Sequence, residues 1–196
     1  MTICRMLASV VLLLSSLALT GCDGLTISET ELNQAVAKQL AQSEQNHIQL
    51  TLEGGNTLDM NLLVKTAHID LTDRDGGLAL VDLNTDLQGT LSAFGQSFSF
   101  STQVNPSFES GVRLEENRVY LVAPKITKIE VEGSSFSDKM LRSTLGSLHD
   151  DFEKALANYF STHPVYVLDH STTEKATASM IKDISIKEDA IEFAIF

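Results

Sequence analysis

Cysteine, proline and tryptophan are all scarce in this chain of 196 residues, which has two cysteines, three prolines and no tryptophan. Cys4 and Cys22 both lie near the start of the chain, and no cysteine follows them. A domain built from the later residues can therefore contain no internal disulfide. Packing of apolar side chains has to stabilise it.

Basic residues are also few. The chain has 14 Lys and Arg against 26 Asp and Glu, which gives a net charge of −12. Nucleic-acid phosphates and anionic lipid headgroups repel such a chain. We therefore expect no nucleic-acid partner and no electrostatic docking on an anionic membrane surface.

The motifs of common enzymes and metal sites are missing. The five histidines are dispersed, with no pair at zinc-ligand spacing, and no Gly-x-Ser-x-Gly elbow or phosphate-binding glycine loop occurs. Asp73-x-Asp75-Gly76 lacks the other ligands of a calcium loop and is explained as a turn. The sequence predicts no catalytic residue, no metal and no cofactor; the remaining enzyme hypothesis is a hydrolase assembled from distant residues.

What the sequence does contain begins with a signal-like N-terminus. Arg5 precedes an apolar run over residues 6–19, and Leu19-Thr20-Gly21-Cys22 follows. This segment resembles a bacterial lipobox. The resemblance implies that residues 1–21 are a signal peptide cut before Cys22, which would receive diacylglycerol on its sulfur and an acyl chain, such as palmitate, on its new amino group. An ordinary secretory signal with a chance cysteine is the alternative.

The residue after Cys22 indicates in which bacterial membrane the protein would be anchored. Asp23 resembles the signal that keeps lipoproteins of enteric-type bacteria in the inner membrane. We therefore expect a lipid-anchored protein on the periplasmic side of a bacterial membrane. The inner membrane is favoured and the outer membrane is the alternative.

Residues 22–196 are expected to form a single α+β domain. Ser28 and Glu31 have the spacing of a capping box, which predicts a short N-terminal helix from Ser28 to about Gln42. Residues 58–131 alternate between apolar and polar side chains in the manner of antiparallel strands. The buried parity changes near Lys65-Thr66, where we expect a bulge or a strong twist, and Asn105-Pro106 interrupts the pattern.

The C-terminal half is predicted to be organised by one long helix. Residues 137–162 carry an apolar stripe at helical spacing. Ser171 and Glu174 then have the spacing of a second capping box, which opens a small C-terminal helix, and two short strands end the chain. The expected architecture is a strongly twisted antiparallel sheet wrapped around the long helix.

The lipobox, the opening segment 25–34 and the segment Asn158-Tyr159-Phe160-x-x-His163-Pro164-Val165-Tyr166 resemble the YceB-like family of bacterial lipoproteins. That family has no settled activity. The resemblance implies a fold like that of tubular lipid-binding domains, in which a sheet rolls around a helix and leaves an apolar tunnel.

Strand parity and the helical stripe then suggest which residues would form the wall of such a cleft. The expected function is the binding of a lipid or other hydrophobic ligand between the sheet and the long helix. The alternative is a structural or partner-docking envelope lipoprotein with a solid core, whose protein partner the sequence does not identify. The hypothetical wall consists of Phe98, Phe100, Leu145, Leu148, Phe152 and Leu156.

Overall fold

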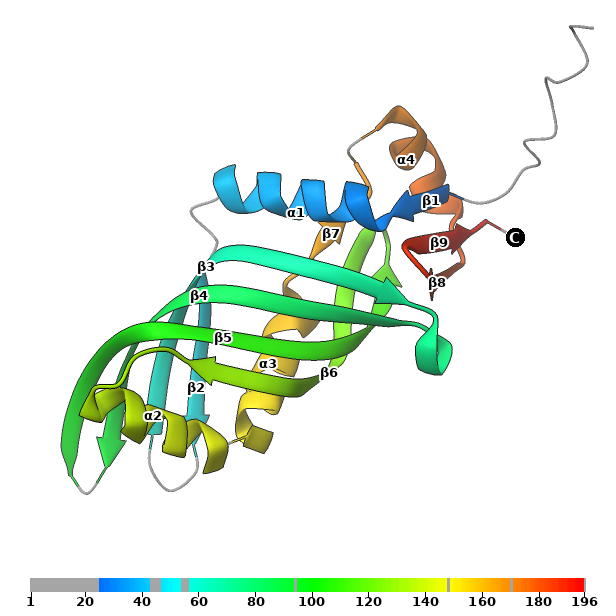
Figure 1. Ribbon diagram of the computed structural model, residues 1–196. Coiled ribbons are helices and arrows are strands. Elements are labelled where there is room, and N and C mark those ends of the chain that lie inside the picture. The colour runs from blue at the N-terminus through cyan, green and yellow to red at the C-terminus, as the bar shows by residue number, and fades with distance from the viewer. Residues whose placement is uncertain are drawn as a thin grey trace, which may run out of the picture.

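Two antiparallel sheets organise the chain in the computed structural model, which describes residues 25–42, 47–53, 57–93, 95–147, 149–169 and 171–195 (Figure 1). Short 3-10 turns at Arg74–Gly76 and Ala178–Met180 accompany the regular elements. In chain order these are β1 (Leu25–Ser28), α1 (Glu29–Gln42), β2 (His47–Glu53), β3 (Thr57–Thr72), β4 (Leu78–Ala93), β5 (Gln96–Glu115), β6 (Arg118–Val131), α2 (Phe136–Ser147), α3 (His149–Thr162), β7 (Tyr166–Val167), α4 (Thr172–Thr177), β8 (Asp183–Lys187) and β9 (Ala190–Ala194).

The larger sheet has six strands in the order β2-β3-β4-β5-β6-β7. Helix α3 contacts both β2 and β6. Because these two strands are first and fifth in the order, one helix can reach both only if the sheet curls around it. Phe152, Leu156 and Phe160 lie on the buried face of α3, and the ring of Phe160 is 5.7 Å from that of Phe108 in β5. The expectation of a twisted antiparallel sheet that wraps around a helix is confirmed.

The prediction of a single long helix is wrong. Residues 136–162 form two helices, α2 and α3, and Figure 1 shows that they run in different directions. Each helix contributes its own part of the apolar stripe. Leu141 and Leu145 come from α2, and Phe152, Leu156 and Phe160 come from α3. An apolar periodicity specifies which side chains face the core but does not require one straight axis. The short N-terminal helix and the small C-terminal helix are present as α1 and α4.

The long strand β3 contains the bulge expected from its change of parity. Its register against β4 shifts between Val64 and Thr66. Val64 is buried before the shift and Ile69 is buried after it, and both line one cavity. The extra residue at the bulge therefore keeps both halves of the strand facing the concave side of the sheet.

Strand β5 continues through Asn105-Pro106, where the sequence pattern predicts a break. The pairing with β4 runs from Gln96 to Val104 and resumes at Ser107. Pro106 therefore lies where the ladder to β4 is interrupted, which is where a residue without an N–H can be accommodated.

Helix starts follow the capping rules. Ser28 Oγ accepts a hydrogen bond from the Glu31 N–H at 3.3 Å, and the Glu31 carboxylate accepts one from the Ser28 N–H at 2.9 Å. Ser171 Oγ likewise accepts from the Glu174 N–H at 3.0 Å. The predicted capping box at Ser28 is thus confirmed, and Ser171 is confirmed as the N-cap of α4. A further cap, in which the hydroxyl and N–H of Ser135 donate to Asp138 at the start of α2 and hold the pKa of that carboxyl below its usual range, was not predicted.

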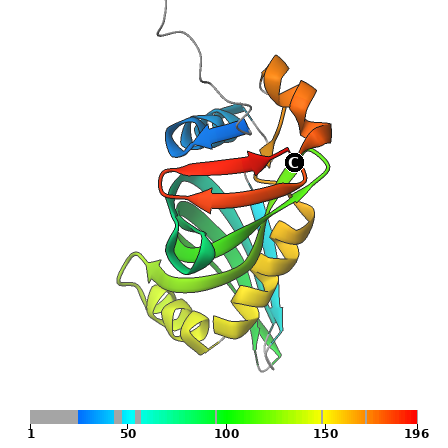
Figure 2. The same cartoon turned by 90° about the vertical axis from the view of Figure 1, so that its right-hand side faces the viewer.

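The smaller sheet has the order β1-β9-β8 and stands across one end of the larger sheet (Figure 2). Ile27, Ile186, Ile191 and Phe193 point into its interface with the rest of the core and are buried. The two sheets meet closely at Gly77, where an added Cβ would lie 2.7 Å from the carbonyl oxygen of Ile186. Only glycine fits there, since its φ of 109° also disfavours other residues.

The outer edge of β3 is closed by side chains of α1. Strand β2 pairs with β3 only from Thr57 to Leu63, and among the described residues no other strand pairs with this edge beyond that point. The Asn33 side chain accepts from the Ile69 N–H at 2.9 Å and donates to the Ile69 carbonyl at 2.7 Å. The Glu29 carboxylate accepts from the Leu71 N–H at 2.8 Å. Helix α1 thus provides three of the hydrogen bonds that a neighbouring strand would provide, and the Asp189 N–H donates a further one to the Leu71 carbonyl at 3.2 Å.

This arrangement predicts that Asn33→Ala destabilises the fold. The substitution leaves the N–H and C=O of Ile69 without these partners, which costs about 1–3 kcal/mol per unsatisfied buried group. We expect a lower urea midpoint at an unchanged slope. The matched control is Asn158→Ala on the exposed side of α3. Equal midpoints for the two variants would contradict the role given to Asn33.

Candidate functional site

An apolar cavity of about 130 Å³ lies between α1, the concave face of the larger sheet and the C-terminal end of α3. Val36 and Leu40 of α1 form its roof. Its floor is built by aliphatic side chains of the sheet, and Phe160 closes one side. The sheet residues that line it are Ile48, Val64, Ala67, Ile69, Val81, Leu83 and Leu121.

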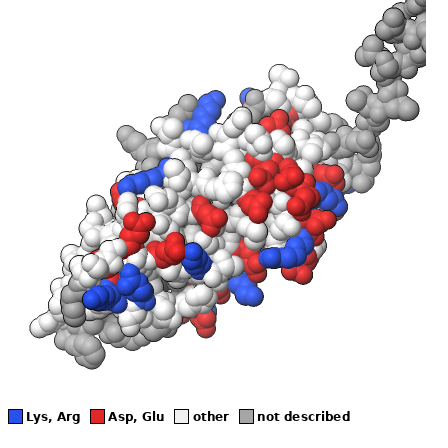
Figure 3. Space-filling model, viewed as in Figure 1, with Lys and Arg blue, Asp and Glu red and all other residues white. Residues whose placement is uncertain are grey.

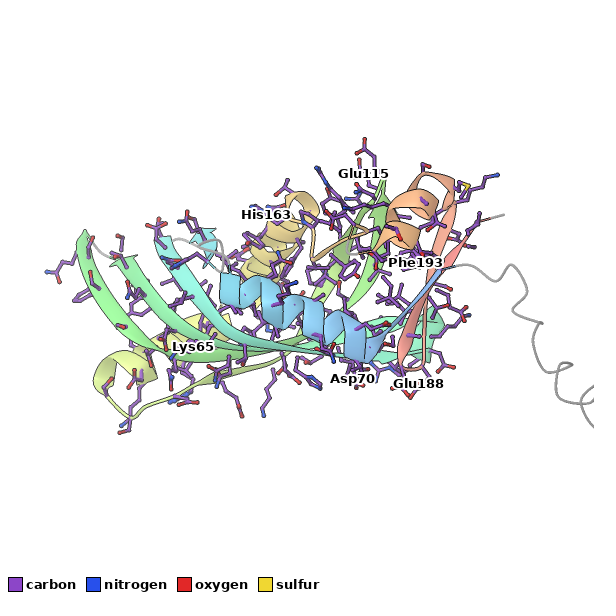
Figure 4. The ribbon with its side chains drawn as sticks, turned by 90° about the horizontal axis from the view of Figure 1, so that it is seen from above. Lys65, Asp70, Glu115, His163, Glu188 and Phe193 are labelled. Atoms are coloured by element: carbon purple, nitrogen blue, oxygen red, sulfur yellow. The ribbon has the colours of Figure 1, made fainter. Side chains whose placement is uncertain are left out.

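Polar groups occur only at the rim of this cavity among the described residues that line it. Figure 4, which looks down on α1, shows His163 at the end of α3. The imidazole of His163 stacks on the ring of Tyr159, with ring centroids 4.0 Å apart and planes within 4°. The Tyr159 hydroxyl donates to the carbonyl oxygen of His47 at 3.3 Å, which joins α3 to β2. Burial raises the pKa of Tyr159, which further favours the protonated form of this hydroxyl that donates the bond.

The rim is completed by Gln39 of α1, whose amide can donate and accept hydrogen bonds. An apolar interior with a few polar groups at its edge suits a ligand with an apolar body and a polar end.

The volume of the cavity limits what it holds. Pockets for drug-sized ligands usually measure about 300–1,000 Å³. A dry cavity of about 150 Å³ accommodates benzene. At about 130 Å³, this space holds the end of an apolar chain or a small ring, and a larger ligand requires α1 to move outward.

Those residues of the cleft wall proposed from sequence that the structure describes do not line this cavity. Leu145, Phe152 and Leu156 are each 1% exposed and belong to the packed core. Phe98 is 45% exposed near the β4–β5 turn. Phe100 is half-buried, with its ring against the backbone of Gly89. Leu148 and Cys22 lie outside the described residues.

Sequence reasoning missed the cavity because its residues come from six elements. The stripe formed by Leu32, Val36 and Leu40 of α1 was visible in the sequence but gave no indication of what it covers. The segment His163-Pro164-Val165 supplied part of the family resemblance, and it forms part of the cavity rim.

Charge is distributed unevenly over the surface. Figure 3 shows acidic side chains gathered over the end of the molecule that holds the β3–β4 turn and the smaller sheet. Within the described part of the chain, no group of three or more His, Cys, Asp or Glu side chains could hold a metal ion. None of the helices described is long and apolar enough to cross a bilayer.

Comparison with known proteins identifies relatives over most of the chain. The model of the family DUF1439, described as "Protein of unknown function", matches residues 27–190. Two curated proteins, both named "Uncharacterized lipoprotein YceB", from Escherichia coli (strain K12) and Shigella flexneri, are 25% identical over 188 residues. Each alignment covers 93% of this chain and 94% of the relative.

A solved structure titled "Crystal structure of lipopolysaccharide binding protein" aligns with a TM-score of 0.37 and 7% identity. The alignment covers 87% of this chain and 48% of that one, so this chain spans about half the length of that protein. A likeness of this size supports no conclusion about function.

A leucine-to-alanine substitution should lower the free energy of unfolding more in the packed core than beside the cavity. Leu156→Ala removes a fully packed side chain and should cost about 2–5 kcal/mol of unfolding free energy. Leu40→Ala should cost at least about 1 kcal/mol less, because Leu40 already faces empty space on one side and has fewer contacts to lose. Chemical denaturation of both variants measures the difference. A larger loss at Leu40 would contradict the placement of the cavity.

Proposed function

The chain belongs to the DUF1439 family, and we propose that it is a lipid-anchored envelope protein that binds a small apolar ligand, or the apolar end of a lipid, beneath α1. The observation that carries this proposal is the apolar cavity with its polar rim. The lipobox-like segment ending at Cys22 supports the anchor, as do the two relatives named as lipoproteins. The proposed location is the periplasmic side of the membrane, with the inner membrane favoured by Asp23.

In this proposal the ligand inserts its apolar end beside Phe160 and leaves its polar end near Gln39 and His163. Helix α1 covers the cavity and is held to β3 at its N-terminal half by Glu29 and Asn33. Its C-terminal half, which carries Val36 and Leu40, can therefore move outward while the N-terminal half stays attached. Such a hinge would let a longer chain enter. The proposal assigns no catalytic residue.

A second function is favoured by the packing itself. The core residues under α2 and α3 are almost fully buried, and the cavity is smaller than the usual ligand pocket. A protein with a solid core would act by docking another envelope protein. Under this alternative, the space beneath α1 is a packing defect without a ligand.

Filling the cavity separates the two functions. Protein from Asp23 to Phe196 is purified, extracted with organic solvent and examined by mass spectrometry for apolar molecules. We expect the wild-type protein to release an apolar ligand at close to one per chain. Ala67→Leu places extra carbon atoms in the cavity and should reduce that amount at least fivefold.

The matched control is Ala155→Leu, a half-buried alanine on α3 that does not line the cavity. It should keep the wild-type amount of ligand. Extracts free of any apolar ligand, from a wild-type protein that unfolds cooperatively, would contradict the proposed function and favour the docking alternative.

A further inference from the structure

A second hollow, of about 970 Å³, lies at the end of the molecule away from the smaller sheet. It is formed by β2, β3, β4 and β5 alone, and it is distinct from the cavity beneath α1. Leu50 and Met60, whose side chains alternate with the polar residues of their strands, are each only 4% exposed. Their side chains occupy the core, so the hollow lies on the outer face of the sheet. We call it the polar trough.

The strand register arranges the side chains of the polar trough in a grid of two rows. Residues that pair directly across antiparallel strands point to the same face. Each row therefore crosses all four strands. The first row is Gln49, Asn61, Gln88 and Ser101, and the second is Thr51, Asp59, Thr90 and Ser99.

The chemistry of the grid is selective. Seven of its eight side chains are uncharged amides or hydroxyls, each able to donate and accept hydrogen bonds. Phosphate and carboxylate ligands are normally held by Arg or Lys, and neither type is present among the described residues that line the trough. An apolar ligand would find no apolar side chain on this face of the grid. The ligand that fits is neutral and rich in hydroxyl groups.

Three side chains of the grid are held by hydrogen bonds within the protein. Thr51 donates to the carboxylate of Asp59 at 2.9 Å, and this contact occupies part of the only charge in the two rows. The Asn61 amide oxygen lies 2.9 Å from His47 Nδ1. Behind the grid, an added Cβ at Gly89 would lie 2.5 Å from the Phe100 ring and 2.6 Å from the Asp59 carbonyl oxygen. This close packing supports a rigid floor, which lowers the entropy cost of binding.

From these observations we infer that the polar trough binds a neutral oligosaccharide. Strands lie about 4.8 Å apart, so the grid extends about 14 Å across the four strands, and its rows are about 7 Å apart. A linear saccharide lying across the strands meets a pair of hydrogen-bonding side chains at each strand. Its hydroxyl groups donate and accept, as the grid does. This site does not depend on the apolar ligand proposed above.

The test measures saccharide binding by the full lipidated chain in nanodiscs. Isothermal titration compares the tetrasaccharides of glucose and of N-acetylglucosamine with tetragalacturonate, which is anionic. We expect at least one neutral tetrasaccharide to bind, and tetragalacturonate to bind at least tenfold more weakly. The double variant Asn61→Ala, Gln88→Ala should weaken the neutral ligand at least tenfold, and Gln88→Glu, which keeps the shape of the side chain, should also weaken it.

The matched control is the double variant His68→Ala, Asp82→Ala, an exposed cross-strand pair on the same face of the sheet but outside the trough. It should bind as the wild type does. The absence of binding by both neutral tetrasaccharides overturns the inference, as does tighter binding of tetragalacturonate or equal loss in the control. Ala67→Leu should leave saccharide binding unchanged, so failure of this site is distinguishable from failure of the cavity beneath α1.

Discussion

The hydrogen bonds from the Asn33 side chain to the backbone of Ile69 determine where α1 lies, and the site depends on that position. Strand β3 is more than twice as long as β2, which leaves half of one edge without a strand among the residues described. An exposed strand edge invites pairing with other chains. By closing this edge with a helix, the chain also places Val36 and Leu40 over the concave face of the sheet. The helix that closes the edge of β3 therefore also forms the roof of the cavity.

Side chains of α2 and α3 fill the rest of the concave face of the larger sheet. Helices α2 and α3 contribute Leu145, Phe152 and Leu156, and the ring contact between Phe108 and Phe160 extends this packing toward α1. A space remains between α1 and the C-terminal end of α3. The polar trough at the far end of the sheet has the opposite chemistry. The two hollows therefore suit different ligands, one apolar and one hydroxylated.

Much of this fold could be predicted from local patterns. The capping box at Ser28 and the N-cap at Ser171 mark the starts of α1 and α4, and the change of parity near Lys65 marks a bulge, because these features depend on residues close in sequence. The division between α2 and α3 could not be read from an apolar stripe that continues across it. The contact between Asn33 and Ile69 spans 36 positions, and no local pattern encodes it. The cavity escaped prediction for the same reason, while Leu156 was assigned to a wall because a helical stripe looks the same beside a cavity or a filled core.

The most direct measurement of the central claim is native-state hydrogen exchange at the Ile69 amide. If α1 acts as the missing strand, this amide should exchange as slowly as those of the central strand β4, since only a large opening would expose it. The Leu71 amide, held by Glu29, should behave in the same way. Exchange at the rate of a solvent-exposed edge amide would show that α1 does not close the edge, and the roof of the proposed site would then lack its attachment.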